Sequence, residues 1–439
     1  MEQGNLKRKL GLYGLTMIAV GSCVGAGIFK TPSQIVEVLP HHGWVLIVWM
    51  IGGLITLTGA LTFAELGALF PKSGGVYVFL KEAYGDVFGF SYGWIMLLVI
   101  NTGSIAALGL AFAEYMTYFI DLSATGKTVL GAGLILSLTG INSLGVETSQ
   151  KIISLFTTMK LVAIAGVIVV AIWVSDSTSA NYNPDLAVNQ PDHLFSAMLL
   201  ALIGVLWSFG GWHHASYLAG ETKDAQRVVP KAMIIGALIV TAVYVAVNWA
   251  YMNLLPLNEI ATSERLAADA LSILPYGGQI VGSIVCISIF GTISIYTMSA
   301  PRIYQAMAAD GIFFKRLAKI HPKYGTPANA MIFQAVWAIV LLLAWGTFHD
   351  LITYVAFADL AFMLLAGMSV FIFRKRGKLN DTFRVPLYPW IPILFGLTTG
   401  AFVLNTLIER PAQSGAGLLL LALGLPLYYF FKRQSTKDV

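Results

Sequence analysis

Long apolar runs alternate with short polar segments along the whole chain. Each run has about 17 to 28 residues, enough for a helix to cross a hydrocarbon layer of ~30 Å. Strands of a membrane barrel would need a polar residue at every second position, and these runs lack that alternation. The pattern predicts an all-α membrane protein with 12 transmembrane helices in a single domain over residues 1–439. The runs are centred near Met17, Ile55, Met96, Ile135, Val162, Ile203, Val240, Ile287, Val340, Leu364, Gly396 and Leu421.

Composition supports the membrane class. Hydrophobic residues make up 57% of the chain and charged residues 11%, well below the ~25% charged of soluble domains. A soluble protein of this composition would expose large apolar patches. The segment Lys7-Arg8-Lys9 leads into the first run without a cleavage motif, so we expect no signal peptide.

The net charge of +5 is explained by where the basic residues lie. If the N-terminus is cytoplasmic, Lys and Arg fall on the inner side, as the positive-inside rule requires. The exceptions are Lys127, Arg265 and Arg410 on the outer side and Lys30 and Lys160 within spans. We therefore expect a multi-pass protein of the cell (inner) membrane with both termini cytoplasmic, and no binding of nucleic acid.

Motifs for catalysis and metal binding are missing from the sequence. Cys23 and Cys286 are the only cysteines, and both lie within apolar runs, which argues against a disulfide framework or a zinc site. No H-E-x-x-H, G-x-S-x-G or Walker pattern stands in a suitable context. We expect neither an enzyme nor a cofactor.

Two glycine-containing clusters interrupt apolar runs near mid-depth. The first run contains Gly21, Gly25 and Gly27 within seven residues, and the sixth contains Trp207–Trp212. Either cluster alone could serve close helix packing. Together they open two successive five-span blocks, about 10–175 and 194–374, followed by helices 11 and 12 at about 386–432. Because five is an odd number, the second block crosses the membrane in the opposite orientation to the first. Breaks at matching positions in two such halves indicate a transporter's binding site.

Such breaks suit a zwitterionic solute. Free amides at the N-terminus of a half-helix attract a carboxylate, and free carbonyls at a C-terminus accept hydrogen bonds from an ammonium. Neither group then needs a buried charged side chain, which is costly in a membrane. An amino acid is the expected substrate. A channel or receptor for a small amine is the alternative from another class.

Several motifs occur in a characteristic order: Gly25–Phe29, Ala64–Gly67, Pro71–Gly75, Phe209–Trp212 leading to Glu221, Ala300–Arg302 and Ala309–Gly311. With them the chain resembles the amino acid–polyamine–organocation superfamily, and within it the L-type amino acid transporter branch. The resemblance covers nearly the whole chain. It implies a leucine-transporter-type 5+5 inverted repeat with broken helices 1 and 6, plus helices 11 and 12, working by alternating access.

The resemblance also implies site residues. By position, the amides of Ala26 and Gly27 would bind the substrate carboxylate, and the carbonyls of Cys23, Trp207 and Gly210 would bind its amine. Gly25 and Phe209 belong to the same substrate-binding set. Trp207 matches the family's aromatic gate, although a packing or lipid-facing aromatic is the alternative for this residue.

Lys160 lies deep in the fifth run, where an ionisable residue is a functional candidate. The resemblance places it near the first span, where sodium-coupled relatives hold an ion, so its ammonium would replace sodium. Transport would then be sodium-independent, either as exchange or coupled to protons. The alternative is a lysine that packs its stem and extends its head to the interface.

Other positions refine these expectations. The pair His213-His214 departs from the branch, and two adjacent histidines near a site could make transport pH-sensitive. The outer loop 121–128 has no cysteine, so no disulfide-linked heavy subunit is expected. No acidic residue adjoins either break, which favours neutral L-amino acids. The acids that look buried are Glu65, Glu114 and Asp359, with Glu65 expected to serve a helix contact.

Overall fold

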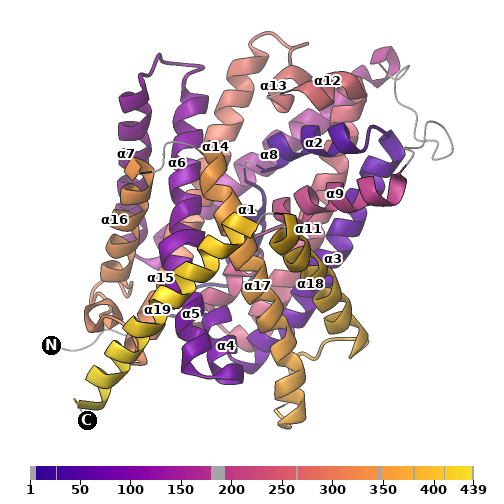
Figure 1. Cartoon of the computed structure of the whole chain (residues 1–439). Coiled ribbons are helices and arrows are strands. Elements are labelled where there is room, and N and C mark those ends of the chain that lie inside the picture. The colour runs from indigo at the N-terminus through magenta and orange to yellow at the C-terminus, as the bar shows by residue number, and fades with distance from the viewer. Residues whose placement is uncertain are drawn as a thin grey trace.

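The computed structural model describes residues 6–25, 27–178, 193–263, 265–344, 348–378, 381–409 and 411–437. These residues fold as a bundle of helices, and their only strand-like pairing is an isolated bridge between Leu10 and Thr222 (Figure 1). The first half of the chain forms α1 (Leu12–Cys23), α2 (Gly27–Val38), α3 (His42–Leu69), α4 (Val76–Tyr84), α5 (Asp86–Ile95), the π-helix η1 (Met96–Ile100), α6 (Asn101–Met116), α7 (Ala124–Ser143) and α8 (Val146–Thr178).

The second half begins with α9 (Leu194–Ser208) and α10 (His214–Tyr217). It continues with the 3-10 helix η3 (Ala219–Glu221), α11 (Ala225–Leu254), α12 (Leu257–Thr262), α13 (Leu266–Ala270), α14 (Gly277–Ser299), α15 (Pro301–Ala309), the 3-10 helix η4 (Lys315–Ala318), α16 (Ala328–Ala344), α17 (Phe348–Lys375), α18 (Trp390–Glu409) and α19 (Pro411–Lys437).

Seven helical segments of the described part are long and apolar enough to cross a membrane. They are α3, α5 through α6, α7, α8, α11, α14 through α15, and α18. The bent pair of α1 and α2 adds an eighth if it counts as one span, and α9 and α16 are shorter apolar helices. The all-α architecture is confirmed, whereas twelve spans remain a prediction.

The helices stop where the glycine clusters lie. Helix α1 ends at Cys23, and α2 resumes at Gly27 after a bend of 43°. Helix α9 ends at Ser208, and turns lead to the single turn of α10. Each interruption leaves backbone groups without intrahelical partners near the middle of the bundle.

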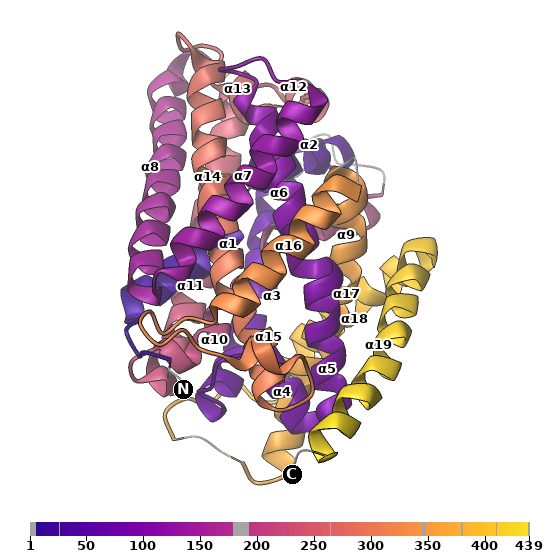
Figure 2. The same cartoon turned by 90° about the vertical axis from the view of Figure 1, so that its left-hand side faces the viewer.

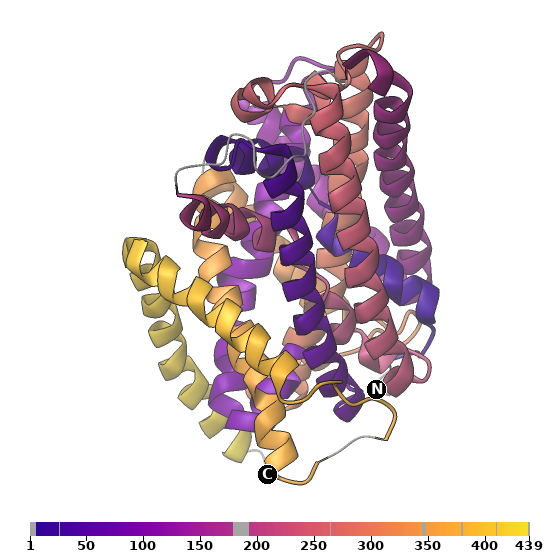
Figure 3. The same ribbon diagram turned by 90° about the vertical axis from the view of Figure 1, so that its right-hand side faces the viewer.

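Long helices run between two ends of the molecule. Helices α12 and α13 lie at one end, whereas α4 and both chain termini lie at the other (Figures 1, 2 and 3). Helix α11 packs against α3, α1 and α8, and α14 packs against α6 and α8. The interrupted helix α1 is therefore held between α8, α11 and α14.

The outer face of α8 shows what surrounds this bundle. Val162, Val169 and Ile172 are each more than half exposed, although all three are apolar. A soluble protein rarely exposes such a row, whereas lipid chains are a suitable solvent for it.

At the end of the bundle where the termini lie, hydrogen bonds connect segments that are distant in sequence. Arg374 donates to both carboxylate oxygens of Glu65, at 2.8 and 2.7 Å, and the Val385 amide donates to the same carboxylate at 2.6 Å. Glu65 thus serves a contact between α3 and α17, as the sequence led us to expect.

A second fastening joins the segment before α1 to the segment after α10. The amides of Lys9 and Leu10 donate to the Glu221 carbonyl at 2.8 and 3.0 Å, and the Lys223 amide donates to the Leu10 carbonyl at 2.9 Å. These hydrogen bonds make the bridge between Leu10 and Thr222. The start of the first interrupted helix is therefore hydrogen-bonded, backbone to backbone, to the segment that follows the second.

Candidate functional site

The two helix interruptions lie against each other. The Ser22 hydroxyl donates to the Gly211 carbonyl at 2.8 Å, and a side-chain carbon at Gly211 would lie only 2.8 Å from the Ser22 carbonyl oxygen. Gly211 also has φ +113°, a region that residues with side chains rarely adopt. Glycine is required here by both backbone conformation and close approach.

Tyr244 of α11 connects the ends of both first half-helices. Its hydroxyl lies 2.7 Å from the Cys23 carbonyl oxygen and 3.0 Å from the Ser208 carbonyl oxygen. Cys23 is the last residue of α1 and Ser208 the last of α9. One buried hydroxyl therefore lies against the last carbonyl of each helix, and the Cys23 carbonyl also accepts the Gly25 amide at 2.8 Å.

A cavity of about 150 Å³ opens beside the two interruptions. A cavity of similar volume in another protein admits benzene, so this one has room for a small organic solute. Its lining comes from both interruptions and from η1, α6, α14 and α17: Ser22, Cys23, Gly25, Gly27, Met96, Ile100, Asn101, Ser104, Ala107, Leu108, Leu206, Trp207, Ser208, Gly210, Gly211, His213, His214, Thr292, Tyr296, Asp359 and Leu360.

Most of the predicted substrate-binding residues reach this cavity. Cys23, Gly25, Gly27, Trp207 and Gly210 all line it. Ala26, the remaining predicted carboxylate ligand, lies outside the described residues.

Phe209 also belongs to the predicted set but does not line this cavity, so its part in substrate binding stays a prediction. Its buried ring packs on Tyr244, with ring centroids 4.9 Å apart, and on Trp49 at 6.0 Å. Its carbonyl accepts the Cys23 thiol at 3.4 Å. Phe209 is the first residue after α9, and its ring packs on aromatic residues of α3 and α11.

Trp207 lies directly against the start of α2. A side-chain carbon at Gly27 would lie 3.1 Å from Cζ3 of Trp207 and 3.3 Å from Oγ of Ser208. The indole therefore borders both the cavity and the N-terminus of α2. No side chain larger than hydrogen fits at Gly27 without displacing this ring.

Lys160 of α8 reaches the interruption of α1 with its full side chain buried. Its ammonium donates to the carbonyls of Gly21 at 2.8 Å and Val24 at 2.6 Å. From α14, the Ser288 carbonyl and the Thr292 hydroxyl oxygen lie at 3.4 and 3.3 Å. A cation surrounded by four oxygen atoms thus joins α8, α14 and the end of α1.

The two histidines lie in the second interruption, and both line the cavity. The Nδ1 atom of His214 is 2.7 Å from the Ser299 hydroxyl, and its ring stacks on Tyr296 with centroids 4.6 Å apart. His213 packs edge-on against Trp212 and Tyr217. Their placement is established, and a role in pH response stays a prediction.

Several lining residues were not predicted from the sequence. Asn101, Tyr296 and Thr292 are polar residues inside apolar runs, which was the available signal. Asp359, noted only as a buried-looking acid, also lines the cavity. Glu114 is exposed, contrary to expectation. In the ranges described, no cluster of His, Cys, Asp or Glu could hold a metal ion.

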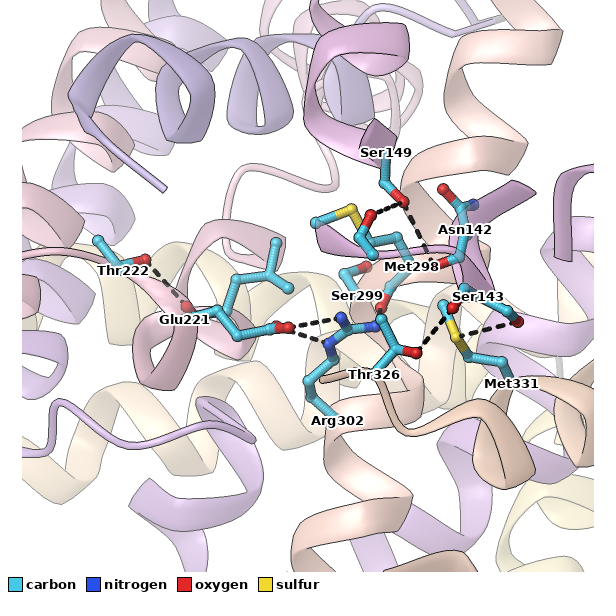
Figure 4. Close-up of polar contacts among 12 residues, drawn as sticks. Asn142, Ser143, Ser149, Glu221, Thr222, Met298, Ser299, Arg302, Thr326 and Met331 are labelled. Carbon is cyan, nitrogen blue, oxygen red and sulfur yellow. Dashed lines mark hydrogen bonds and ion pairs between the residues drawn. The ribbon is translucent and has the colours of Figure 1, made fainter. Parts of the chain in front are cut away.

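Buried polar pairs hold the segment that follows the second interruption. Arg302 of α15 donates from Nε and Nη2 to the two carboxylate oxygens of Glu221, each at 2.8 Å, with both side chains fully buried (Figure 4). Arg302 also donates to the Met298 carbonyl. Nearby, the hydroxyls of Tyr92 and Tyr217 lie 2.5 Å apart. These pairs fasten the segment after the second interruption to α5 and α15.

A family model described as amino acid permease matches residues 10–425 of this chain. The chain belongs to the amino acid permease family. It is therefore a membrane transporter of the amino acid–polyamine–organocation superfamily that resembles the L-type branch, and it is not an enzyme. The predicted class is thus confirmed.

Curated relatives cover almost the whole permease chain. The serine/threonine exchanger SteT of Bacillus subtilis (strain 168) is 34% identical over 99% of both chains. The b(0,+)-type amino acid transporter 1 of Homo sapiens is 31% identical over 97% of this chain and 88% of its own. The large neutral amino acids transporter small subunit 2 of Mus musculus is 30% identical over 97% of this chain and 81% of its own.

Proposed function

We propose that this permease exchanges neutral L-amino acids across the membrane by alternating access and without sodium. The observation that carries the proposal is the Lys160 ammonium between the carbonyls of Gly21 and Val24 and the hydroxyl of Thr292. Oxygen ligands of this kind suit a sodium ion equally well. A covalently attached cation in their midst takes that ion's place and removes the need for it.

The helix ends at the cavity supply both partners of a zwitterion. Gly27 begins α2, so its amide belongs to the unpaired N-terminal turn, where the helix dipole favours a carboxylate. We assign the carboxylate to the amides of Gly27 and Ala26, next to Gly25. The amine goes to the carbonyls of Cys23, Trp207 and Gly210. The Cys23 carbonyl already accepts from the Tyr244 hydroxyl and from the Gly25 amide, so a substrate amine there would take the place of one of these donors.

Trp207 is assigned as the gate over this substrate. Its position against Gly27 at the cavity wall supports that role. A gate of this kind excludes water from the loaded site and commits the substrate to crossing.

The proposal includes the topology expected from sequence. It has twelve spans, with two inverted halves of about 10–175 and 194–374 and helices 11 and 12 beyond them, in the cell (inner) membrane. Both termini lie at one end of the molecule, as an even number of spans requires (Figure 1). Both are assigned to the cytoplasm on the placement of Lys and Arg. No disulfide-linked heavy subunit is included.

The deciding experiment uses purified protein in liposomes and a panel of labelled amino acids. Uptake should require unlabelled amino acid inside, saturate, and stay unchanged when choline or potassium replaces sodium. Accumulation driven by a sodium gradient would contradict the proposal. Uptake that neither saturates nor accelerates with internal substrate would indicate a channel, and binding without flux would indicate a receptor.

Proton-coupled symport is the second candidate, favoured by one observation: Asp359, His213 and His214 all line the cavity. Protonatable groups in a transporter's interior often belong to proton relays. An acidic exterior should then drive amino acid into liposomes that contain none. An exchanger fails to accumulate substrate under that gradient.

A further inference from the structure

Two segments at the end of the bundle where the termini lie form one strongly basic surface. They are the chain ahead of α1 and the connection between α15 and α16. These segments come from opposite ends of the sequence, so their meeting is a property of the fold. Their exposed basic residues, called the basic patch below, are Lys7, Arg8, Lys9, Arg316, Lys319 and Lys323.

Hydrogen bonds hold these segments against each other and against the end of α7. The Lys7 ammonium donates to the Lys323 carbonyl at 3.1 Å. The Thr326 hydroxyl, in the same connection as Lys323, donates to the Ser143 carbonyl of α7 at 2.9 Å. Helix α7 in turn packs against α8 and α16 (Figure 2). The basic patch is therefore a surface that the fold holds in place.

Glu147 is the one acid within the described residues that pairs with the basic patch. Its carboxylate lies 3.8 Å from the Lys9 ammonium and is shared with Lys151 of α8 at 3.7 Å, with all three side chains at least half exposed. Exposed pairs of this kind contribute little energy. Residues 6–10 and 311–327 contain no Asp or Glu. The patch therefore carries a positive charge that the protein itself hardly balances.

Basic residues elsewhere at this end of the bundle do meet acids. The Lys81 ammonium lies 2.7 Å from the Asp310 carboxylate. Arg374 lies 2.7 Å from the Glu65 carboxylate. The positive-inside rule explains why Lys and Arg gather at this end, but it does not require acids to be missing from one part of it. The shortage of acids at the basic patch points to a partner that brings its own negative charge.

The surface beside the basic patch is apolar. Leu144 directly after α7, Leu155 on α8 and Ile332 on α16 are each at least half exposed. Helices α7 and α8 are long and apolar enough to cross a membrane, so their junction lies at a membrane surface in either orientation of the chain. Cations above a lipid-facing apolar surface match the two parts of an anionic phospholipid, its headgroup and its acyl chains. A soluble anion would need only the cations.

We propose that the basic patch binds the headgroup of an anionic phospholipid whose acyl chains lie along α7, α8 and α16. Phosphate oxygens accept strong hydrogen bonds from Lys and Arg. Clusters of four to eight such residues next to a membrane span are typical of binding sites for anionic lipids. The patch lies outside the substrate cavity, so the proposal does not depend on which amino acid the permease exchanges.

The test uses the full-length protein in detergent, with phosphatidylglycerol and phosphatidylcholine of identical acyl chains as probes. Native mass spectrometry measures the lipid retained, and the thermal unfolding temperature measures the stabilisation that binding brings. Phosphatidylglycerol should be retained at a concentration at least about tenfold lower than phosphatidylcholine, because each Lys or Arg near an anionic group strengthens binding several-fold. Added salt should reduce the rise in unfolding temperature, because exposed charges are screened.

The triple variant Arg8→Gln, Arg316→Gln and Lys319→Gln should lose this preference. Its phosphatidylglycerol retention should fall to the level of phosphatidylcholine. All three side chains are exposed, and none of them makes the hydrogen bonds that join the two segments, so the fold should be kept.

A second triple variant is the matched control: Lys223→Gln, Arg227→Gln and Lys231→Gln. It removes the same charge from exposed positions around the start of α11, where Asp224 lies among the basic residues. These positions are outside the basic patch. The control should therefore retain phosphatidylglycerol as the unmodified protein does.

Three outcomes would overturn the proposal. Equal retention of the two lipids by the unmodified protein would show that the headgroup charge is not recognised. Equal losses in the two triple variants would show that retention follows net charge and not the basic patch. An equal rise in unfolding temperature with glycerol phosphate would show that the patch takes a free anion instead of a lipid. Each of these outcomes leaves the amino acid exchange proposed above standing.

Discussion

The Lys160 ammonium lies 2.6 Å from the carbonyl oxygen of Val24, one residue beyond the end of α1. A side chain from α8 thus completes the hydrogen bonding of an interrupted helix from outside it. The last carbonyls of any helix need such partners. Here the partner is a charged group that is covalently attached to the protein.

Replacing Lys160 by Met should reduce amino acid exchange tenfold or more. The substitution keeps an apolar stem but removes the charged donor, so the carbonyls of Gly21 and Val24 keep only the more distant hydroxyls of Thr292 and Ser288, at 3.3 and 3.2 Å. The expected cost is about 1–3 kcal/mol. That shifts the balance between inward-open and outward-open forms. Exchange rates in liposomes measure the loss. Lys151→Met on the same helix is the control, because its side chain is 73% exposed, and full transport by Lys160→Met would contradict the role.

Tyr244→Phe should lower both thermal stability and the exchange rate. The ring can keep its packing against Trp49 and Phe209, but the Ser208 carbonyl loses the Tyr244 hydroxyl and the Cys23 carbonyl keeps only the Gly25 amide. The expected destabilisation is about 1–3 kcal/mol, measured by unfolding in detergent.

Tyr251→Phe provides the control for this loss. Tyr251 is equally buried on the same helix, and its hydroxyl has no partner within the described residues. Removing that hydroxyl should be neutral or slightly stabilising. If both substitutions change the stability equally, the hydrogen bonds of the Tyr244 hydroxyl contribute nothing to the free energy of unfolding.

Gly27→Val should abolish exchange while the protein still folds. The added carbons would enter the space of the Trp207 ring and block approach to the N-terminus of α2. Uptake assays and size-exclusion profiles separate loss of function from loss of fold. Gly166→Val is the control, because nothing lies within 4 Å of a side-chain carbon at Gly166 on the exposed face of α8. Near-normal uptake in Gly27→Val would remove α2 from the site.

The pair of Glu221 and Arg302 should show strong coupling in a double-mutant cycle. Arg302→Met alone leaves a buried carboxylate unpaired, at about 3–5 kcal/mol, whereas adding Glu221→Leu should recover much of that loss. Denaturation in detergent measures the three variants. The pair of Lys9 and Glu147, 3.8 Å apart and half exposed, should show almost no coupling. Additive losses at Glu221 and Arg302 would show that they act independently.

The sequence predicted the features that depend on the backbone. Glycines in an apolar run are visible as letters, and the interruptions at Val24 and Phe209 follow them. A lysine within a span is equally visible, and its burial makes a carbonyl-rich partner necessary. Its position near the first span came from family resemblance, and the structure places it there.

The sequence does not predict in the same way whether a residue points into the protein interior or toward lipid. Lipid and protein interior are both apolar, so a spanning helix carries little periodic signal of which face is inside. For this reason the sequence does not point to Tyr244, and it does not distinguish Glu114 from Asp359. Only three-dimensional packing separates an acid at a cavity from an acid at the surface.

The bridge between Leu10 and Thr222 has a mechanical consequence. It joins the entry of α1 to the segment whose Glu221 side chain holds Arg302. A displacement of Glu221 would therefore also act on the chain ahead of α1 through these hydrogen bonds. A fusion or truncation that disturbs Lys9 and Leu10 would remove this connection between the two interrupted helices.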